Sequence, residues 1–322
     1  MNIPVLCNVN KIYRADCIKS ISEKKYNFLV KAYTHKSKYF AFSFLLKIFF
    51  YSFFYKKIVI VIDYWAIKPV AIISSIPFIA NRLIIDFYDI FTLRPANPQL
   101  VDSKYEQLII NNCKSFFARS FELRHYFKLN KISGKKCIFF PDVKPIESKK
   151  NAMRPGGFDR IVFLGGIGTE EIGKLDKISG GIKLDIFLAP DQNVFSTKSN
   201  IAFFKSIDHE KFNSILVNYN FGICLINEDA NVFNISAASK YMAYLESGLI
   251  VITDPRHRIS KWYKRYYPDR FIFINDNDLG KINMNFLIEN YNNLLNKSSQ
   301  SEININIFLI NLKEKITNLI YA

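Results

Sequence analysis

Two short stretches of the sequence hold residue types that bind phosphate groups. The first, Gly165-Gly166-Ile167-Gly168-Thr169, is a glycine-rich turn after an apolar run. Because glycine has no Cβ, such a turn lets the backbone approach a phosphate closely. The second stretch begins a run with helical spacing and contains Ser236, Ser239, Lys240 and Tyr244. The free backbone N–H groups at a helix start, together with hydroxyl and ammonium groups, can bind a phosphate. Both stretches also fit an ordinary turn and an ordinary αβ unit that bind no ligand.

Other charged residues follow apolar runs in the first half of the chain. Arg119 ends a short run and is a candidate for a phosphate contact. Asp63, Asp86 and Asp89 lie at the predicted carboxyl ends of strands, where open α/β sheets bind ligands. A carboxylate there can act as a general base towards a hydroxyl group, and Asp89 is the first candidate. Aspartate is also common in turns and caps, which is the alternative for all three.

Helices and strands must alternate along the chain to position these residues. The continuous apolar run at 58–62 predicts a parallel strand buried on both faces. Further strands are predicted at 82–87, 115–118, 137–140, 160–164, 183–188, 201–204, 221–226, 249–252 and 271–274. The segments between them favour helices, and Ser20 to Glu23 matches a capping box that would open one. The Phe-rich segment from Tyr39 to Lys57 predicts a core helix with an exposed aromatic and basic face, rather than a membrane span.

The polar stretch KKNAMRPGG, 149–157, divides the alternating pattern into two arrays and predicts a linker. The expected domains are 1–148 and 158–300, followed by a C-terminal helix at 301–322 that packs back on the first domain. Two successive arrays of this size predict an α/β protein with two Rossmann-like domains that face a cleft.

The positive charge of the chain is concentrated in its first half. The net charge is +16, and residues 1–150 carry 25 Lys and Arg against 10 Asp and Glu, whereas the rest carries 19 against 18. A basic domain suggests an anionic partner such as a membrane surface, a nucleic acid or a phosphorylated substrate. A solvated lysine-rich surface is the alternative.

The cysteine and histidine pattern predicts neither a disulfide framework nor a metal centre. The five cysteines are scattered without a CxxC pair, which fits the reducing cytosol, and the N-terminus lacks the pattern of a secretory signal. The one Asp-x-Asp, at Asp276 and Asp278, falls in a polar turn, so we expect no metal site there.

Several segments together resemble the GT-B glycosyltransferases, especially their family 4-like group. Ser239 to Ile252, SKYMAYLESGLIVI, resembles the segment sPxKlxEYlaxGxPVI of these enzymes. Four more pieces resemble the family in the expected order over about residues 55–255: Leu83 to Asp89, Phe116 to Ser120, Phe140 to Asp142 and Arg160 to Gly168. The resemblance implies a GT-B fold, a nucleotide-sugar donor in the second domain, an acceptor in the first, and catalysis without a metal or other cofactor.

The family pattern is incomplete in this chain. The family glutamate that holds the nucleotide ribose falls on Ala243, and its partner would fall on Ile235. Glu246, one helical turn away, is a candidate substitute, although a solvated surface glutamate is the alternative. The donor type and the choice between retention and inversion therefore stay open. The resemblance implies donor contacts from 165–169, Ser236, Ser239, Lys240, Tyr244 and Arg119.

These observations predict a bacterial, cytoplasmic glycosyltransferase at the inner membrane surface. Its basic, Phe-rich first domain suits a lipid-linked acceptor at an anionic membrane, as in assembly of lipopolysaccharide, O-antigen or capsule. One alternative is a catalytically inactive GT-B-like scaffold or binding subunit, which the missing glutamates favour. Another is a nucleic-acid-binding protein, but the sequence has no RNP, zinc-finger or helix-turn-helix pattern, so no nucleic-acid partner is expected.

Overall fold

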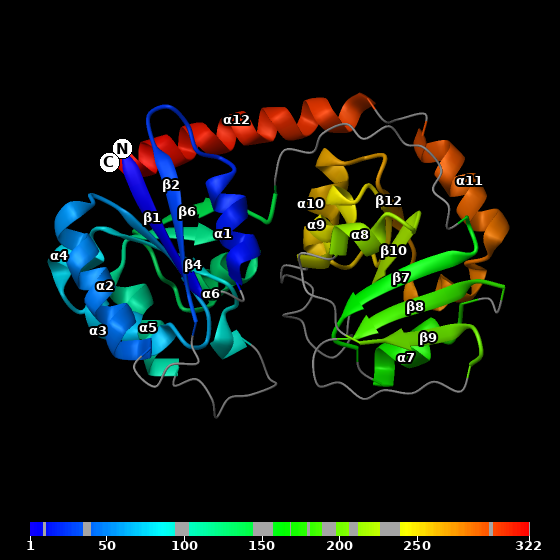
Figure 1. Cartoon of the computed structure of the whole chain (residues 1–322), viewed down its shortest axis with the longest axis horizontal. Coiled ribbons are helices and arrows are strands. Elements are labelled where there is room, and N and C mark those ends of the chain that lie inside the picture. Colours follow the sequence, from blue (N-terminus) through cyan, green and yellow to red (C-terminus); the bar gives the residue numbers. More distant parts are fainter. Residues whose placement is uncertain are drawn as a thin grey trace. The chain divides into compact units, whose positions relative to one another are not determined.

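Two compact units make up the chain (Figure 1). The computed structural model describes residues 1–8, 11–34, 40–93, 103–143, 157–167, 169–178, 181–188, 198–205, 212–225, 239–295 and 299–321. The first unit is Met1–Lys144 with Leu309–Ala322, and the second is Pro145–Phe308. Each contains a six-stranded sheet whose described strands all pair in parallel, so the chain is an α/β protein with two Rossmann-like sheets.

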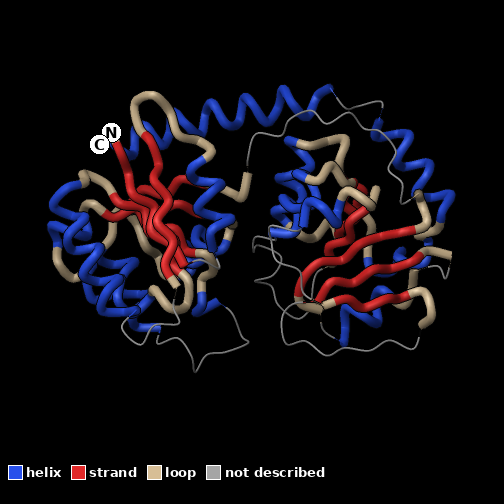
Figure 2. The backbone as a smooth tube through the Cα atoms, viewed as in Figure 1, coloured by secondary structure: helices blue, strands red, loops and turns tan. Residues whose placement is uncertain are grey.

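The sheet of the first unit has the strand order β2-β1-β3-β4-β5-β6. Its strands are β1 (Asn2–Asn8), β2 (Asn27–Tyr33), β3 (Ile58–Ile62), β4 (Leu83–Phe87), β5 (Ser115–Ala118) and β6 (Lys136–Phe139). Its helices are α1 (Ile12–Lys19), α2 (Phe40–Phe54), α3 (Ile67–Ser74), α4 (Pro77–Ala80), α5 (Ser103–Asn112) and α6 (Glu122–Leu129), with a 3₁₀ turn at Phe91–Leu93. Figure 2 shows the strands as one layer with helices on both sides.

Successive side chains of β4 point to opposite faces of this sheet, and helices pack on each face. Leu83 and Ile85 join a core that α2, α3 and α5 cover, while Asp86 points to the other face and meets Arg14 of α1. All five residues of β3 are buried, as expected for a strand covered on both faces. The continuous apolar run at 58–62 was therefore a sound indicator of a buried parallel strand.

The prediction of a helix opening at Ser20 is wrong. Helix α1 ends at Lys19, and the Ser20 hydroxyl donates to the Cys17 carbonyl oxygen, so the serine closes a helix instead of opening one. Strands β1 and β2 were not predicted from the sequence. Strand β2 is partly exposed along much of its length and carries Asn27 and Lys31 at its exposed positions, because it is an edge strand that pairs with β1.

The second unit has the strand order β12-β11-β10-β7-β8-β9. Its strands are β7 (Arg160–Gly165), β8 (Lys183–Leu188), β9 (Ile201–Phe204), β10 (Phe221–Cys224), β11 (Ile250–Thr253) and β12 (Phe271–Phe273). Its helices are α7 (Thr169–Leu175), α8 (Phe212–Leu216), α9 (Ser239–Glu246), α10 (Arg258–Tyr266) and α11 (Met284–Leu295), with a 3₁₀ segment at Asp276–Lys281. The order reverses between β7 and β10, which is the switch point of a doubly wound sheet.

The last helix, α12 (Ser299–Tyr321), has contacts in both units. In its first half, the ring of Phe308 lies 4.9 Å from that of Trp262. At its end, the Tyr321 hydroxyl donates to the Lys25 carbonyl oxygen at 2.9 Å. Leu309–Ala322 thus belong with the first unit, as expected for a C-terminal helix that packs back on the N-terminal domain.

Candidate functional site at the switch point of the second sheet

The switch point brings together two segments that are far apart in the sequence. Strands β7 and β10 pair with Ile161 opposite Phe221 and Val162 opposite Gly222, so their carboxyl ends lie side by side. The glycine turn follows β7, and α9 enters the sheet layer through β11, the other neighbour of β10. Ligands of open α/β sheets bind at this point because the connections leave in opposite directions.

Gly165 provides the backbone geometry of the turn after β7. Its φ is +96°, which is a region that residues with a Cβ rarely adopt, and a Cβ at this position would meet no described atom within 4 Å. Gly166 is exposed. Gly168 lies outside the described residues, and Thr169 is the first residue of α7. The described part of the turn is therefore open enough for a phosphate to reach its backbone.

Lys240, in the first turn of α9, contacts the strand that leads into this turn. Its Nζ is 4.0 Å from the centroid of the Phe163 ring, which belongs to β7. Burial raises the pKa of the Cys224 thiol at the end of β10, and the Lys240 charge opposes that rise. The ammonium group therefore lies near the ends of both central strands. Ser239 is the residue before it in α9, and Ser236 lies outside the described residues.

Tyr244 holds α9 in place and does not present its hydroxyl to a ligand. The side chain is fully buried. The hydroxyl accepts from the Leu164 backbone N–H at 3.0 Å and lies 3.3 Å and 3.2 Å from the carbonyl oxygens of Val162 and Ile223. These are groups of β7 and β10, so Tyr244 ties the helix across the switch point. The prediction of a donor contact from Tyr244 does not fit this burial.

The Tyr244 ring occupies the place where Gly222 would carry a Cβ. A Cβ built there would lie 2.7 Å from both Cγ and Cδ1 of the ring. We expect Gly222→Ala to lower the free energy of unfolding by about 1–3 kcal/mol, because the ring and the strand would have to move apart. Chemical denaturation followed by circular dichroism measures this loss.

Gly173→Ala in α7 is the matched control, since a Cβ there meets no described atom within 4 Å. It should be neutral or raise stability by up to about 1 kcal/mol. A double variant, Gly222→Ala with Tyr244→Ala, should lose less than the two single losses added together. Strict additivity would contradict the proposed contact.

Glu246 lies at the opposite end of α9 from Lys240. It is the last residue of the helix, just before the chain turns through Gly248 into the amino end of β11. At about 1.5 Å per residue, the backbone at Glu246 is roughly 9 Å along the helix from Lys240. The candidate substitute for the family glutamate is thus at the edge of the sheet away from the glycine turn.

Arg256 is a second cation at the carboxyl edge of the second sheet. It follows β11, and its guanidinium donates to both carboxylate oxygens of buried Asp254. The Arg256 side chain remains 49% exposed. The register places Thr253 opposite Cys224, so Arg256 follows the strand beside β10. A strand end followed by Asp and Arg was the signal available in the sequence.

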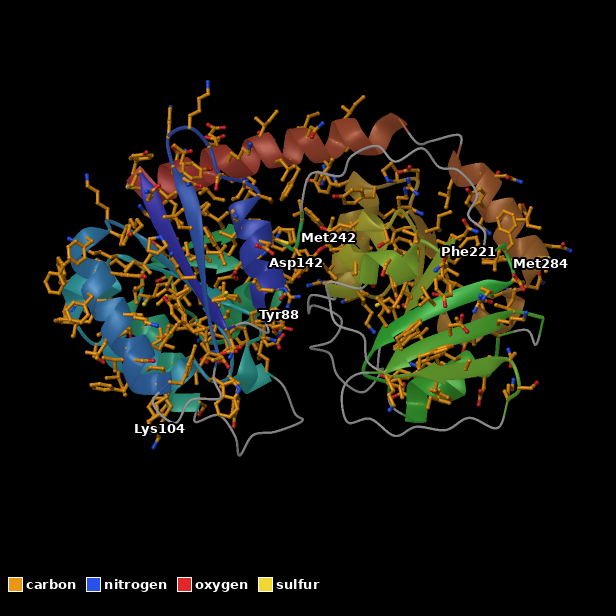
Figure 3. All side chains as sticks on the ribbon, viewed as in Figure 1. Tyr88, Lys104, Asp142, Phe221, Met242 and Met284 are labelled. Carbon is orange, nitrogen blue, oxygen red and sulfur yellow. The ribbon has the colours of Figure 1, made fainter. Side chains whose placement is uncertain are left out.

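A buried network of charges joins three strand ends in the first unit. Arg14 contacts Asp86 at 2.7 Å and Asp142 at 3.2 Å, and Arg119 contacts Asp142 at 2.6 Å. Arg14 also donates to the carbonyl oxygens of Phe140 and Pro141. Figure 3 labels Asp142 and Tyr88, the residue whose carbonyl oxygen accepts from Arg119 at 3.3 Å. The network thus connects α1 with the ends of β4, β5 and β6.

Arg119 belongs to this network instead of lying open to a ligand. It is buried, and its guanidinium lies 3.9 Å from the centroid of the Tyr88 ring. Burial alone would lower its pKa, but the charge of Asp142 and, to a smaller extent, those of Tyr88 and Asp89 raise it well above the ordinary value. The guanidinium of Arg119 is therefore held by Asp142 and Tyr88 within the first unit.

The candidate bases lie at the carboxyl edge of the first sheet. Asp89 is half-buried two residues after β4, and Asp63 is buried directly after β3. Asp63 accepts from the backbone N–H groups of Trp65 and Ala66, which is the turn role that short polar side chains often have. Asp86 is committed to Arg14. Asp89 is the candidate base among the three that is only half-buried, and its charge also acts on Arg119.

The described residues include no group of three or more His, Cys, Asp or Glu side chains placed to hold a metal ion. No described helix has the length and apolar character needed to cross a membrane.

The fold has counterparts among solved structures, although no protein-family model and no curated protein sequence matches the chain. HepE from Anabaena, in complex with UDP, is 11% identical with a TM-score of 0.58 over 99% of both chains. A DNA-modifying β-glucosyltransferase, studied with uridine diphosphoglucose, is 12% identical with a TM-score of 0.56 over 100% of both chains. An α-glucosyltransferase with UDP and a 13-mer DNA is 10% identical with a TM-score of 0.55, over 100% of this chain and 95% of that one.

These similar structures are GT-B glycosyltransferases, and the chain shares their two-domain, Rossmann-like architecture. At identities this low, the similarity shows the fold alone. The GT-B fold predicted from the motifs is confirmed.

Proposed function

We propose that the second unit binds a nucleotide-sugar at the β7–β10 switch point and that the protein transfers the sugar to an acceptor hydroxyl. One observation carries the proposal: the sheet order places the open Gly165-Gly166 turn, the start of α9 and the Lys240 ammonium at the same switch point. Similar folds bound to UDP or UDP-glucose support it.

The chemistry follows from the charge that a nucleotide carries away. When the sugar–phosphate bond breaks, negative charge grows on the phosphate oxygen, and groups that already point at it lower the barrier. Lys240 supplies a cation, and the glycine turn and α9 supply backbone N–H groups. Asp89 is the proposed base for the acceptor hydroxyl. In this proposal no metal or other cofactor takes part.

The proposed acceptor is a lipid-linked glycan of the bacterial surface, such as lipopolysaccharide, O-antigen or capsule. The excess of 15 positive charges in residues 1–150 supports an acceptor at an anionic membrane, where each cation near the surface adds to binding. The corresponding place of action is the cytoplasmic side of the inner membrane.

A DNA acceptor is the second candidate, because two of the similar structures are described with DNA as substrate or ligand and the first unit is strongly basic. An inactive scaffold is the third, because Ala243 and Ile235 stand where the family has glutamates.

A thermal-shift screen against UDP-, GDP-, CMP- and dTDP-sugars tests the donor site. We expect one nucleotide class to stabilise the protein by about 2.7 kcal/mol at a hundred times its Kd, which raises the melting temperature by several degrees. Release of the nucleotide in the presence of a glycolipid or a DNA acceptor then identifies the acceptor class. Binding without release with either acceptor would favour the scaffold, and no shift with any nucleotide would contradict the proposal.

A further inference from the structure

Helix α2 of the first unit has apolar side chains on both of its faces. Its buried face is Phe40, Phe44, Ile48 and Ser52, which pack on the core beneath it. Its outer face is Phe42, Leu46, Phe49, Phe50, Phe53 and Phe54, with side chains that are 36% to 79% exposed. We call this outer side the phenylalanine face. A helix that is apolar all round is normally buried, so this face needs a covering surface.

The phenylalanine face continues onto the neighbouring helix turn. The ring of Phe53 lies 5.0 Å from that of Phe49 and 5.9 Å from that of Phe78 in α4. Phe78 is 46% exposed, and Ile72 and Ile76 beside it in the sequence are 49% and 40% exposed. Isolated exposed apolar residues are normal, whereas a connected group marks an interaction site.

The charges around this face are positive. Residues 40–85 contain five basic residues, Lys47, Lys56, Lys57, Lys68 and Arg82, and one acidic residue, Asp63, which is buried. Arg82 lies 4.2 Å from the Phe78 ring centroid, and its guanidinium donates to the carbonyl oxygens of Ser52 and Tyr55 at the end of α2. The segment therefore combines an apolar face with a cationic border.

We propose that the phenylalanine face inserts into the interfacial layer of an anionic lipid bilayer. Aromatic side chains on one side of a helix and basic residues at its border are the combination that binds a helix flat to such a surface. At about 1.5 Å per residue, the 15 residues of α2 extend roughly 22 Å, short of the about 30 Å of a hydrocarbon core, so the helix lies in the surface.

Charge argues against the other occupants. A second copy docked face to face would bring two sets of cations together without an acidic partner from this segment. A nucleic acid would meet the cations but would leave the phenylalanine rings against its phosphates. This inference deepens the membrane part of the proposed function, and it is independent of the donor site because the surface lies in the other unit.

Vesicle flotation with the full chain tests the proposal without any sugar transfer. Phosphatidylcholine vesicles that contain phosphatidylglycerol should bind the protein, and vesicles of phosphatidylcholine alone should bind it at least about tenfold more weakly. Phe50→Ser with Phe54→Ser should lower binding to the anionic vesicles at least about tenfold, because two large apolar groups are lost from the interface. Both side chains are exposed, and circular dichroism melts should show an unchanged fold.

Leu129→Ser is the matched control, since Leu129 is 59% exposed in the same unit but lies on α6. It should bind vesicles like the parent protein. Phe50→Trp should gain fluorescence that brominated lipids quench, which places the side chain at the acyl boundary. Three results would overturn the proposal: no vesicle binding, vesicle binding that the double serine variant keeps, or a dimer or a DNA complex that this variant abolishes in place of vesicle binding.

Discussion

Lys240→Ala is expected to weaken binding of the stabilising nucleotide-sugar about 10- to 100-fold. The ammonium would be a charge-assisted hydrogen-bond donor to the phosphates, and such a bond contributes about 1.5–3 kcal/mol. The unliganded variant should melt close to the parent protein, since a half-buried lysine over one aromatic ring adds about 0.5–1 kcal/mol. Isothermal titration calorimetry measures the binding loss, and nucleotide release measures the loss of transfer.

Lys261→Ala is the control for a change of net charge, because Lys261 is an exposed lysine of α10 in the same unit. It should leave the affinity unchanged. Lys240→Arg should recover part of the affinity if the role is purely that of a cation. An unchanged Kd together with unchanged nucleotide release in Lys240→Ala would move the donor site away from the switch point. Unchanged binding with lost release would instead give Lys240 a role in the reaction alone.

Arg14→Met is expected to lower the free energy of unfolding by about 3–5 kcal/mol at neutral pH. Arg14 is fully buried, and its removal leaves the Asp86 carboxylate without its cation in the interior. It also removes donors from the Phe140 and Pro141 carbonyl oxygens. Urea unfolding at neutral pH measures the effect. A loss below about 1 kcal/mol would show that the network is not formed in solution.

The pH dependence gives this prediction a distinctive sign. Burial raises the pKa of Asp86 above its ordinary value even though the charge of Arg14 opposes the rise. Without Arg14 the pKa rises further, and a carboxyl with a raised folded pKa stabilises the fold more as the pH falls. The deficit of Arg14→Met should therefore shrink from neutral pH towards pH 5 or so.

The pKa of Asp142 is shifted in the opposite direction from that of Asp86. Although burial opposes ionisation, Arg119 and Arg14 hold its pKa below the ordinary value. The stability that it adds is present above its unfolded pKa of about 3.9 and is lost as the pH falls through the lower folded pKa.

Arg14→Met combined with Asp86→Leu should recover much of the loss at neutral pH, because an apolar pair replaces a buried ion pair at little cost. A deficit that is constant with pH would contradict the role of Asp86.

Local sequence was sufficient wherever a strand is covered on both faces. The strands at 58–62, 115–118 and 221–224 are largely apolar because neither side of them meets water, and the first two have their predicted bounds. The glycine turn after β7 and the helix at Lys240 were also predicted from the sequence. Both depend on neighbouring residues: the turn on Gly165, and the helix on the spacing of its apolar side chains. The edge strand β2 gave no such signal, since its exposed face carries polar side chains.

Tertiary structure decided which of these local features meet and which side chains stay available. Arg119 and Tyr244 were both predicted to contact the donor, yet Arg119 is paired with Asp142, and the Tyr244 hydroxyl is paired with the backbone across β7 and β10. Lys240 meets Phe163 only because the sheet order reverses between β7 and β10. Strand order and the burial of a polar group depend on contacts between residues that are distant in the chain. Composition and periodicity established the α/β class and the basic first half, and packing alone assigned the polar residues to core, network or site.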